Sequence, residues 1–307
     1  MTVAADIAYQ RRQAEIGLFY GLFSYLWWGF IPLYFKLVAH VPAIVILSHR
    51  VVWSFVLLLI VSIAMKQLAQ IVAAVRDRRV LMMLVFSTIL LATNWGGFIY
   101  AVTTNRVMQS SLGYFINPLV SIALGIILLR ERLRPMQAVS LALAIVGVAV
   151  IALAQGNVPM IALIVAFSFA GYGLVRKLAH VGPLAGLTVE TALLLPLAIA
   201  YLWHERAIVT GTDRATDGLL MLSGIVTATP LLAFTAAMRR LKLSTMGFLQ
   251  YLVPTCQFLL AVFAFQEPLD RIRLSGFVLI WAVLIVCGID SFRAFRRPVD
   301  ESAIAEL

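Results

Sequence analysis

Apolar residues occupy the chain in stretches of about 20, and short polar segments that hold most of the charge separate them. A helix needs ~20 apolar residues to cross the ~30 Å hydrocarbon core of a bilayer. The pattern therefore predicts a multi-pass membrane protein with ten helical spans. The expected spans are 16–37, 44–65, 79–102, 110–129, 136–153, 159–178, 184–203, 217–238, 245–265 and 272–292.

The spans are expected to be α-helices, which makes the fold class an all-α integral membrane protein. Strands of a membrane barrel would alternate apolar and polar residues over ~10 positions, and these stretches do not alternate. The longest internal connection, around 204–216, is too short to build a soluble core. Residues 1–15 lack the order of a cleaved signal peptide, so we expect a cytosolic arm there and a cytosolic tail at 293–307.

Composition and charge agree with a membrane protein and predict its orientation. Hydrophobic residues make up 62% of the chain, charged residues 12%, and the mean hydropathy is +0.98. If the amino terminus is inside, 17 of the 24 Lys and Arg residues fall in inside segments, Arg176 and Lys177 among them. This bias predicts both termini in the cytoplasm. The net charge of +10 is thereby explained by topology, and no nucleic-acid partner is expected.

The two halves of the chain resemble each other. The stretch 84–142 matches 220–278 at a constant offset of 136, and KLVAHV at 36–41 is echoed by KLAHV at 177–181. The matched pairs are Leu84 and Leu220, Ala92 and Ala228, Thr93 and Thr229, Phe98 and Phe234, Ala101 and Ala237, Pro118 and Pro254, Leu124 and Leu260, Glu131 and Glu267, and Leu133 and Leu269.

Each half, 16–153 and 159–292, has five expected spans, and an odd number requires the second copy to enter the membrane upside down. Inverted repeats supply secondary transporters with two states of similar energy that open to opposite sides. The alternative is an old duplication that is retained only for packing.

Several strings resemble the RarD subfamily of the EamA transporters, in the drug/metabolite transporter superfamily, over nearly the whole chain. They are WWGFIPLYFK at 27–36, HRVVWS at 49–54, SLGYFINPL at 111–119, LRERL at 129–133, SFAGYGLVRK at 168–177, ETALLLP at 190–196 and QYLVP at 250–254. The resemblance implies ten helices in two inverted five-helix EamA repeats and the movement of small molecules across the plasma membrane. Subfamily names refer to chloramphenicol sensitivity, and the resemblance carries over no substrate-binding residue.

Arg50 is the only Lys or Arg expected well inside a span, about six residues below the outer end of 44–65. Charged side chains at this depth are costly and mark substrate pathways or paired sites. Trp53 shares its helical face, and we take both residues as candidates for the binding of substrate. The alternative is an arginine whose side chain extends to the interface.

Glu190 is the counterpart of Arg50 at an offset of 140. Inversion places the two residues ~15 Å apart along the membrane normal, so we expect no direct salt bridge between them. Glu190 is a candidate protonation site. The alternative, which the residues favour, is a neutral carboxyl that forms a hydrogen bond with a neighbour.

Polar side chains follow one face of the fourth and ninth expected spans, beside a proline that is expected to bend each helix. We expect them to line a central cavity that the two halves share. Packing between helices is the alternative, for which small residues are equally suited. The cavity candidates are Tyr114, Asn117 and Ser121, Gln250 and Gln257, with Asn94 of the third span, and the expected bends are Pro118 and Pro254.

The sequence offers little for catalysis. None of the four His residues has metal-ligand spacing with another His, a Cys or a carboxylate, and there is no nucleotide-binding fingerprint. We therefore expect neither a metal nor a cofactor, and the protein is not expected to be an enzyme.

The favoured function is a secondary transporter that exports small amphipathic metabolites or drugs by alternating access, either coupled to protons or facilitative. The alternatives are a membrane receptor or regulatory subunit without net flux and, within transport, a passive channel. The expected partners are a small-molecule substrate and the lipid bilayer, and the protein is expected to be a monomer or a weak homodimer.

Overall fold

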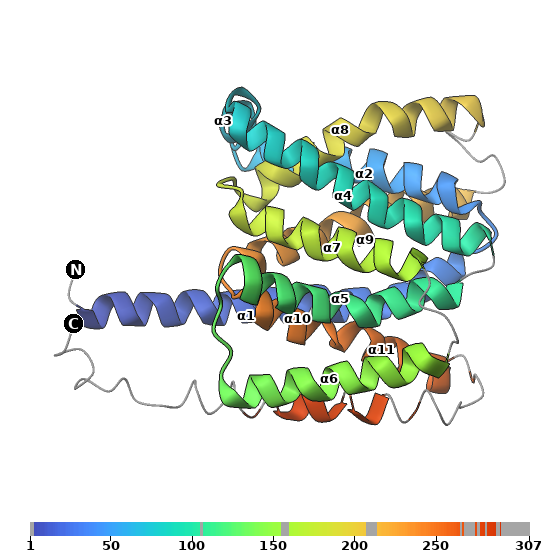
Figure 1. The fold of residues 1–307 in the computed structure, drawn as a ribbon. Helices are drawn as coiled ribbons and strands as arrows, with labels where there is room; N and C mark the ends of the chain where they lie inside the picture. The colour runs from blue at the N-terminus through green and yellow to red at the C-terminus, as the bar shows by residue number, and fades with distance from the viewer. Residues whose placement is uncertain are drawn as a thin grey trace.

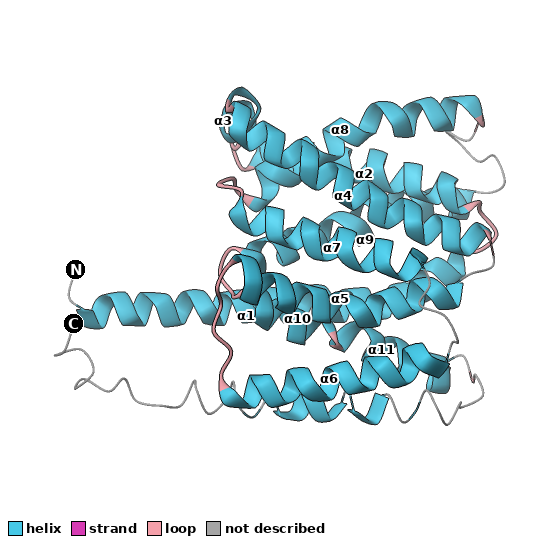
Figure 2. Cartoon of the chain, viewed as in Figure 1, coloured by secondary structure: helices cyan, strands magenta, loops and turns pink. Residues whose placement is uncertain are grey.

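The computed structural model of the 307-residue chain describes residues 3–104, 107–154, 160–206 and 214–264, together with 266, 274, 277–279, 281–286 and 289. Within these ranges helices are joined by turns and loops, and there is no strand (Figure 2). The expected tail at 293–307 and much of the tenth expected span lie outside the described residues.

The helices of the first half are α1 Val3–Leu37, α2 Ala43–Ala64, α3 Leu68–Arg76, α4 Arg78–Thr103, α5 Val107–Leu128 and α6 Pro135–Ala154. The second half contains α7 Met160–Leu178, α8 Pro183–His204, α9 Arg214–Met238, α10 Leu243–Gln250, α11 Leu252–Leu259 and a short π-helix at Leu260–Ala264.

The all-helical membrane fold is confirmed. Seven helical segments of the described chain are long and apolar enough to cross a membrane. Three shorter apolar helices, Leu112–Leu128, Pro135–Val150 and Phe277–Val286, match the fourth, fifth and tenth expected spans, and the last of them includes residues that the structure does not describe. Apolar side chains on the outside, such as Ile127 (71% exposed) and Phe263 (77% exposed), suit contact with lipid tails.

The two halves run through the bundle in opposite directions (Figure 1). In the view of Figure 1, α1 runs from left to right, whereas α7, the first helix of the second half, runs from right to left. The left end of the bundle holds the junctions between α2 and α3, α5 and α6, α7 and α8, and α9 and α10. The charge distribution predicts that this end faces the cytoplasm, and we call it the inner end.

Three features differ from the expected spans. The helix α1 begins at Val3, so the expected arm continues the first span as helix and extends beyond the rest of the bundle (Figure 1). The connection after α2 contains α3, which is too short for a span and packs on α4 and α8. The ninth span is interrupted at Tyr251, three residues before Pro254, because that proline lacks an N–H and its ring opposes the carbonyl of Gln250.

The core between the two halves is aromatic. Tyr25 and Trp28 of α1, Tyr172 of α7 and Phe234 of α9 pack in one buried cluster. The rings of Tyr172 and Phe234 are stacked, with centroids 6.0 Å apart and an interplanar angle of 12°. This packing orients the Tyr172 hydroxyl toward α8, where the first of two charged clusters lies.

Candidate functional site

Glu190 lies fully buried in α8, seven residues after that helix begins at Pro183. Its carboxylate accepts hydrogen bonds from Ser87 Oγ of α4 at 2.5 Å and from the Tyr172 hydroxyl of α7 at 3.2 Å. Arg176 Nε of α7 lies 3.6 Å from Glu190 Oε1. We call Ser87, Tyr172, Arg176 and Glu190 the inner cluster. A carboxylate removed from water needs partners of this kind, because its desolvation costs several kcal/mol.

The burial of Arg176 was not expected from the sequence. The charge count assigned it to the inner connections and left Arg50 as the only basic residue well inside a span. In the structure Arg176 belongs to α7 and its side chain is 1% exposed. Its Nε and Nη1 have no hydrogen-bond partner in the part of the chain that the structure describes. Glu190 therefore supplies the charge that balances it.

Gly186 makes room for this pair. An added Cβ at Gly186 would collide with both terminal nitrogens of the Arg176 guanidinium. The side chain of Arg176 thus lies directly against the backbone of α8. Gly186 is four residues before Glu190 on the same helix, so both residues present the same face to α7.

Arg50 lies in α2, seven residues after that helix begins at Ala43. Its Nε donates a hydrogen bond of 2.8 Å to Thr227 Oγ1 of α9. The guanidinium carbon lies 5.5 Å from the ring centroid of Phe35 and 5.2 Å from that of Trp95, which are distances of cation–π contacts. We call Phe35, Arg50, Trp95 and Thr227 the outer cluster.

Two tyrosines extend the outer cluster. Tyr34 and Tyr114 lie within electrostatic range of Arg50. The Tyr34 hydroxyl donates to the carbonyl of Leu219 at 3.0 Å, and the Tyr114 ring lies 6.4 Å from that of Phe98. Of the two polar stripes expected from the sequence, Tyr114 is thus the member that the structure brings to Arg50.

The remaining members of the stripes are mostly buried on α5 and α10. Asn117 is fully buried, accepts a hydrogen bond from Ser121 Oγ at 3.3 Å, and its Nδ2 has no partner among the described residues. Gln250 is 6% exposed, whereas Gln257 is partly exposed. Pro118 lies within α5, which continues through it, and its carbonyl lies close to Gly247 of α10.

Asn94 and Trp53 contact neighbouring helices. Asn94 Nδ2 donates to the carbonyl of Val165 at 2.9 Å, which ties α4 to α7. The backbone of Trp53 lies against Gly224 where α2 crosses α9, and a Cβ at Gly224 would collide with it.

Two charged side chains make contacts at the inner end: Glu131 links the two halves, and Lys177 links two segments of the second half. Glu131, in the connection after α5, accepts hydrogen bonds from the backbone N–H groups of Leu243 and Ser244 at 2.7 and 2.8 Å and from Ser244 Oγ at 2.7 Å. Its carboxylate thereby caps the positive amino-terminal end of α10. Lys177 Nζ of α7 donates to the carbonyls of Met238, the last residue of α9, and of Leu241, which follows that helix. Sequence reasoning did not assign a role to either residue.

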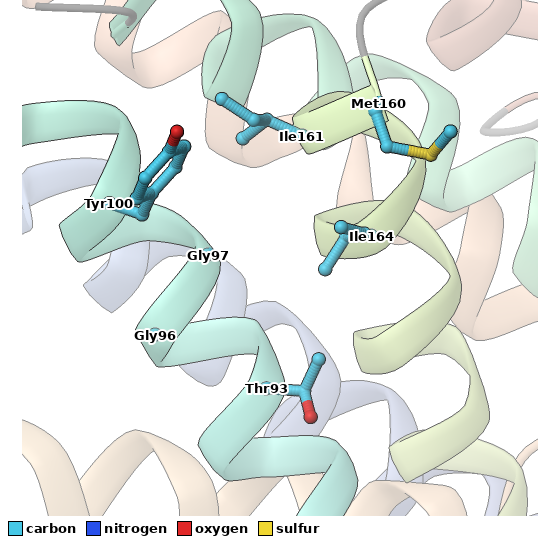
Figure 3. A pocket seen from close by; sticks show the side chains of 7 residues that line it. All are labelled: Thr93, Gly96, Gly97, Tyr100, Met160, Ile161 and Ile164. Atoms are coloured by element: carbon cyan, nitrogen blue, oxygen red, sulfur yellow. The ribbon is translucent and has the colours of Figure 1, made fainter. Parts of the chain in front are cut away.

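A groove of about 560 Å³ lies between α4 and α7 (Figure 3). Tyr100, Met160 and Ile164 on its rim are exposed on the outside of the bundle. The groove is lined by Thr93, Gly96, Gly97, Tyr100, Met160, Ile161 and Ile164. None of the site residues expected from the sequence lines it.

Ten apolar helical segments in two antiparallel halves, with charged side chains buried between them, define a polytopic membrane protein of the transporter class. The chain belongs to the EamA-like transporter family, whose model matches residues 15–153 and 158–288, one repeat in each half. It is therefore a membrane transporter and not an enzyme.

Individual relatives agree with this assignment. The chain is 42% identical over 290 residues to "Protein RarD" of Escherichia coli K12, with 93% of this chain and 98% of that protein covered. It is 41% identical over 292 residues to "Protein RarD" of Streptomyces exfoliatus, with coverage of 93% and 92%. A solved crystal structure shares the fold at 18% identity, with a TM-score of 0.69 over 88% of this chain and 96% of the other.

Proposed function

We propose that this protein is a secondary transporter that exports small amphipathic metabolites or drugs across the plasma membrane by alternating access, with both termini in the cytoplasm. The observation that supports it most is that the two repeats run in opposite directions, so that one charged cluster lies near the outer end and the other near the inner end. Arg50 and Glu190 each lie seven residues into their helices, but α2 begins at the outer end and α8 at the inner end.

Alternating access also requires contacts between the halves that close one side at a time. Glu131 of the first half and the amino-terminal end of α10 of the second half form such a contact at the inner end. The polar part of this contact consists of three hydrogen bonds to one carboxylate, which can be exchanged for hydrogen bonds to water at moderate cost. In this proposal the structure represents a state that is closed toward the cytoplasm.

The outer cluster is the proposed substrate site, with Arg50 and Tyr114 as its principal contacts. Asn117, Ser121 and Gln250 line the path between the two ends in this proposal, because α5 and α10 contact each other and all three side chains are buried. Gln257, on the adjoining α11, continues that path. The buried amide nitrogen of Asn117, which has no partner among the described residues, supports such a path, since a buried donor without a partner is costly unless a ligand or water meets it.

Glu190 is the proposed protonation site. It is a buried carboxylate whose charge is balanced by Arg176, and taking up a proton would cancel one charge of the pair. Such a change alters the interaction of α8 with α7, so proton binding is linked to the relative position of two helices. The protein is proposed to act as a monomer or a weak homodimer.

Flux through reconstituted protein tests the function. A comparison of the medium of cells with and without the protein identifies the solute whose export depends on it most, and this solute is then loaded into proteoliposomes. We expect time-dependent movement and counterflow, in which a gradient of unlabelled solute drives labelled solute uphill. Binding without flux would indicate a receptor or regulatory subunit, and flux without counterflow a channel.

A further inference from the structure

Within the part of the chain that the structure describes, Arg50 has no acidic partner, whereas its repeat counterpart Glu190 has a basic one. Among the described residues, no carboxylate forms an ion pair with Arg50, and its one hydrogen bond to them goes to the neutral hydroxyl of Thr227. A positive charge within a span is costly. In the inner cluster the corresponding charge of Glu190 is balanced by Arg176 at 3.6 Å.

The repeat shows which residue is missing. Aligning Lys36 with Lys177 in the matching strings places Phe35 opposite Arg176. Phe35 contacts Arg50 as Arg176 contacts Glu190, so the two clusters use the same pair of positions. At the position that holds a counter-charge in the inner cluster, the outer cluster has an apolar ring.

We propose that the substrate itself supplies this counter-charge, and that the transported solutes are small organic carboxylates with an apolar, often aromatic, body. This inference rests on the proposed function and names the class of its substrate. The carboxylate binds the guanidinium of Arg50, and the body of the solute lies against Trp95, Phe35 and Tyr114.

The geometry of the outer cluster suits this chemistry. A guanidinium presents five N–H donors in a planar fork that matches a carboxylate, and the bond to Thr227 uses only Nε. Phe35 and Trp95 contact the guanidinium through their rings, which hold it in place without neutralising its charge. A neutral solute would leave the arginine charge unbalanced, whereas an organic anion removes that cost on binding.

Matched pairs of ligands test the inference. The purified protein is heated with phenylacetate, 3-phenylpropionate or indole-3-acetate at millimolar concentration, and separately with the primary amide of each, which keeps the shape and removes the charge. We expect at least one carboxylate to raise the melting temperature by about 2 to 3 °C, as a ligand at ~10 times its Kd does for a chain of this size, and its amide not to.

Two variants and a control connect the effect to Arg50. Arg50→Met should abolish the carboxylate shift, because the fork is lost. Phe35→Glu should abolish it too, because a protein carboxylate then occupies the place of the ligand, as Arg176 does for Glu190. Arg12→Met, at an exposed position of α1, should keep the full shift.

Three results would overturn the inference: no shift with any carboxylate, equal shifts with the amides, or a shift that persists in Arg50→Met. Loss of folded protein in Arg50→Met leaves Phe35→Glu as the deciding variant, because it removes no charge from the chain and adds the missing one. Flux and counterflow of a neutral solute alongside any of these results would leave the transporter function standing and refute only the substrate class.

Discussion

A buried ion pair is stable only while both partners are present. Arg176 and Glu190 are 1% and 0% exposed, so neither charge can turn to water when the other is removed. Breaking such a pair from one side costs about 3 to 5 kcal/mol, whereas replacing both charges by groups of similar volume is often neutral. The pair is therefore required as a unit.

Glu190→Gln should lower the free energy of unfolding by about 3 kcal/mol or more, because Arg176 is left buried without a counter-charge. The double variant Arg176→Met with Glu190→Gln should regain most of that loss. Thermal melts of the purified variants measure both. If Glu190 is the protonation site, the stable double variant should still exchange solute but should no longer respond to an imposed pH gradient.

A double variant as unstable as the single one would show that the two side chains do not act as a pair.

Gly186→Ala serves as an independent check on the same geometry. Its methyl group would displace the Arg176 guanidinium, so it should destabilise the protein by about 1 to 3 kcal/mol, although alanine has the higher helix propensity.

The sequence allowed the charged residues inside the apolar stretches to be found but not their partners. Glu190 and Arg50 are conspicuous because apolar residues surround them on both sides. Arg176 comes two residues before the end of α7, where a basic residue ordinarily indicates the inner interface, so hydropathy alone could not show that it points into the bundle. The sequence did not indicate that Phe35 and Trp95 belong to a site, because aromatic residues are also common in the belts at membrane interfaces.

At the scale of helices, the short α10 depends on its cap. It has eight residues and no side-chain cap at Lys242, so its first backbone N–H groups find their acceptor in Glu131, which is distant in sequence. The expected spans could not show this contact, because it joins two connections. The expected spans also do not include α3, because its nine residues are too few to cross a membrane.

Glu131→Gln should destabilise the protein by about 1 to 2 kcal/mol, because hydrogen bonds to a charged acceptor are stronger than those to a neutral one and the favourable interaction with the helix dipole is lost. Glu15→Gln is a suitable control, since that exposed side chain lies 3.9 Å from Arg11 and contributes little. Equal melting temperatures for Glu131→Gln and the parent protein would show that the cap is dispensable.

At the scale of the whole molecule, hydropathy and charge are sufficient to predict the architecture. Ten apolar segments, the duplication and the odd number of spans per half predict antiparallel repeats without any tertiary contact. The interruption at Tyr251 depends on where Pro254 falls relative to the helical hydrogen bonds of one span, while its counterpart Pro118 lies in a continuous α5. Repeat symmetry alone did not predict that difference.

Orientation can be measured with single cysteines in a background where Cys256 and Cys287 are replaced. Val72→Cys and Arg239→Cys, exposed at the inner end, should not react with an impermeant thiol reagent in intact cells but should react after permeabilisation. Thr104→Cys and Glu205→Cys, exposed at the other end, should react in intact cells. The reverse pattern would contradict the charge-based orientation.

Transport by alternating access requires the two halves to exchange between states that open to opposite sides. Two buried reporters measure it without a known substrate: Met246→Cys near the inner end and Thr227→Cys in the outer cluster, which are 0% and 2% exposed. Glu131→Ala, which removes the inner contact, should raise the reactivity of Met246→Cys from the cytoplasmic side by roughly 5- to 30-fold, the factor for 1 to 2 kcal/mol. It should lower the reactivity of Thr227→Cys from the outside at the same time. Reactivity that rises at both reporters, or changes at Met246→Cys alone, would contradict alternating access.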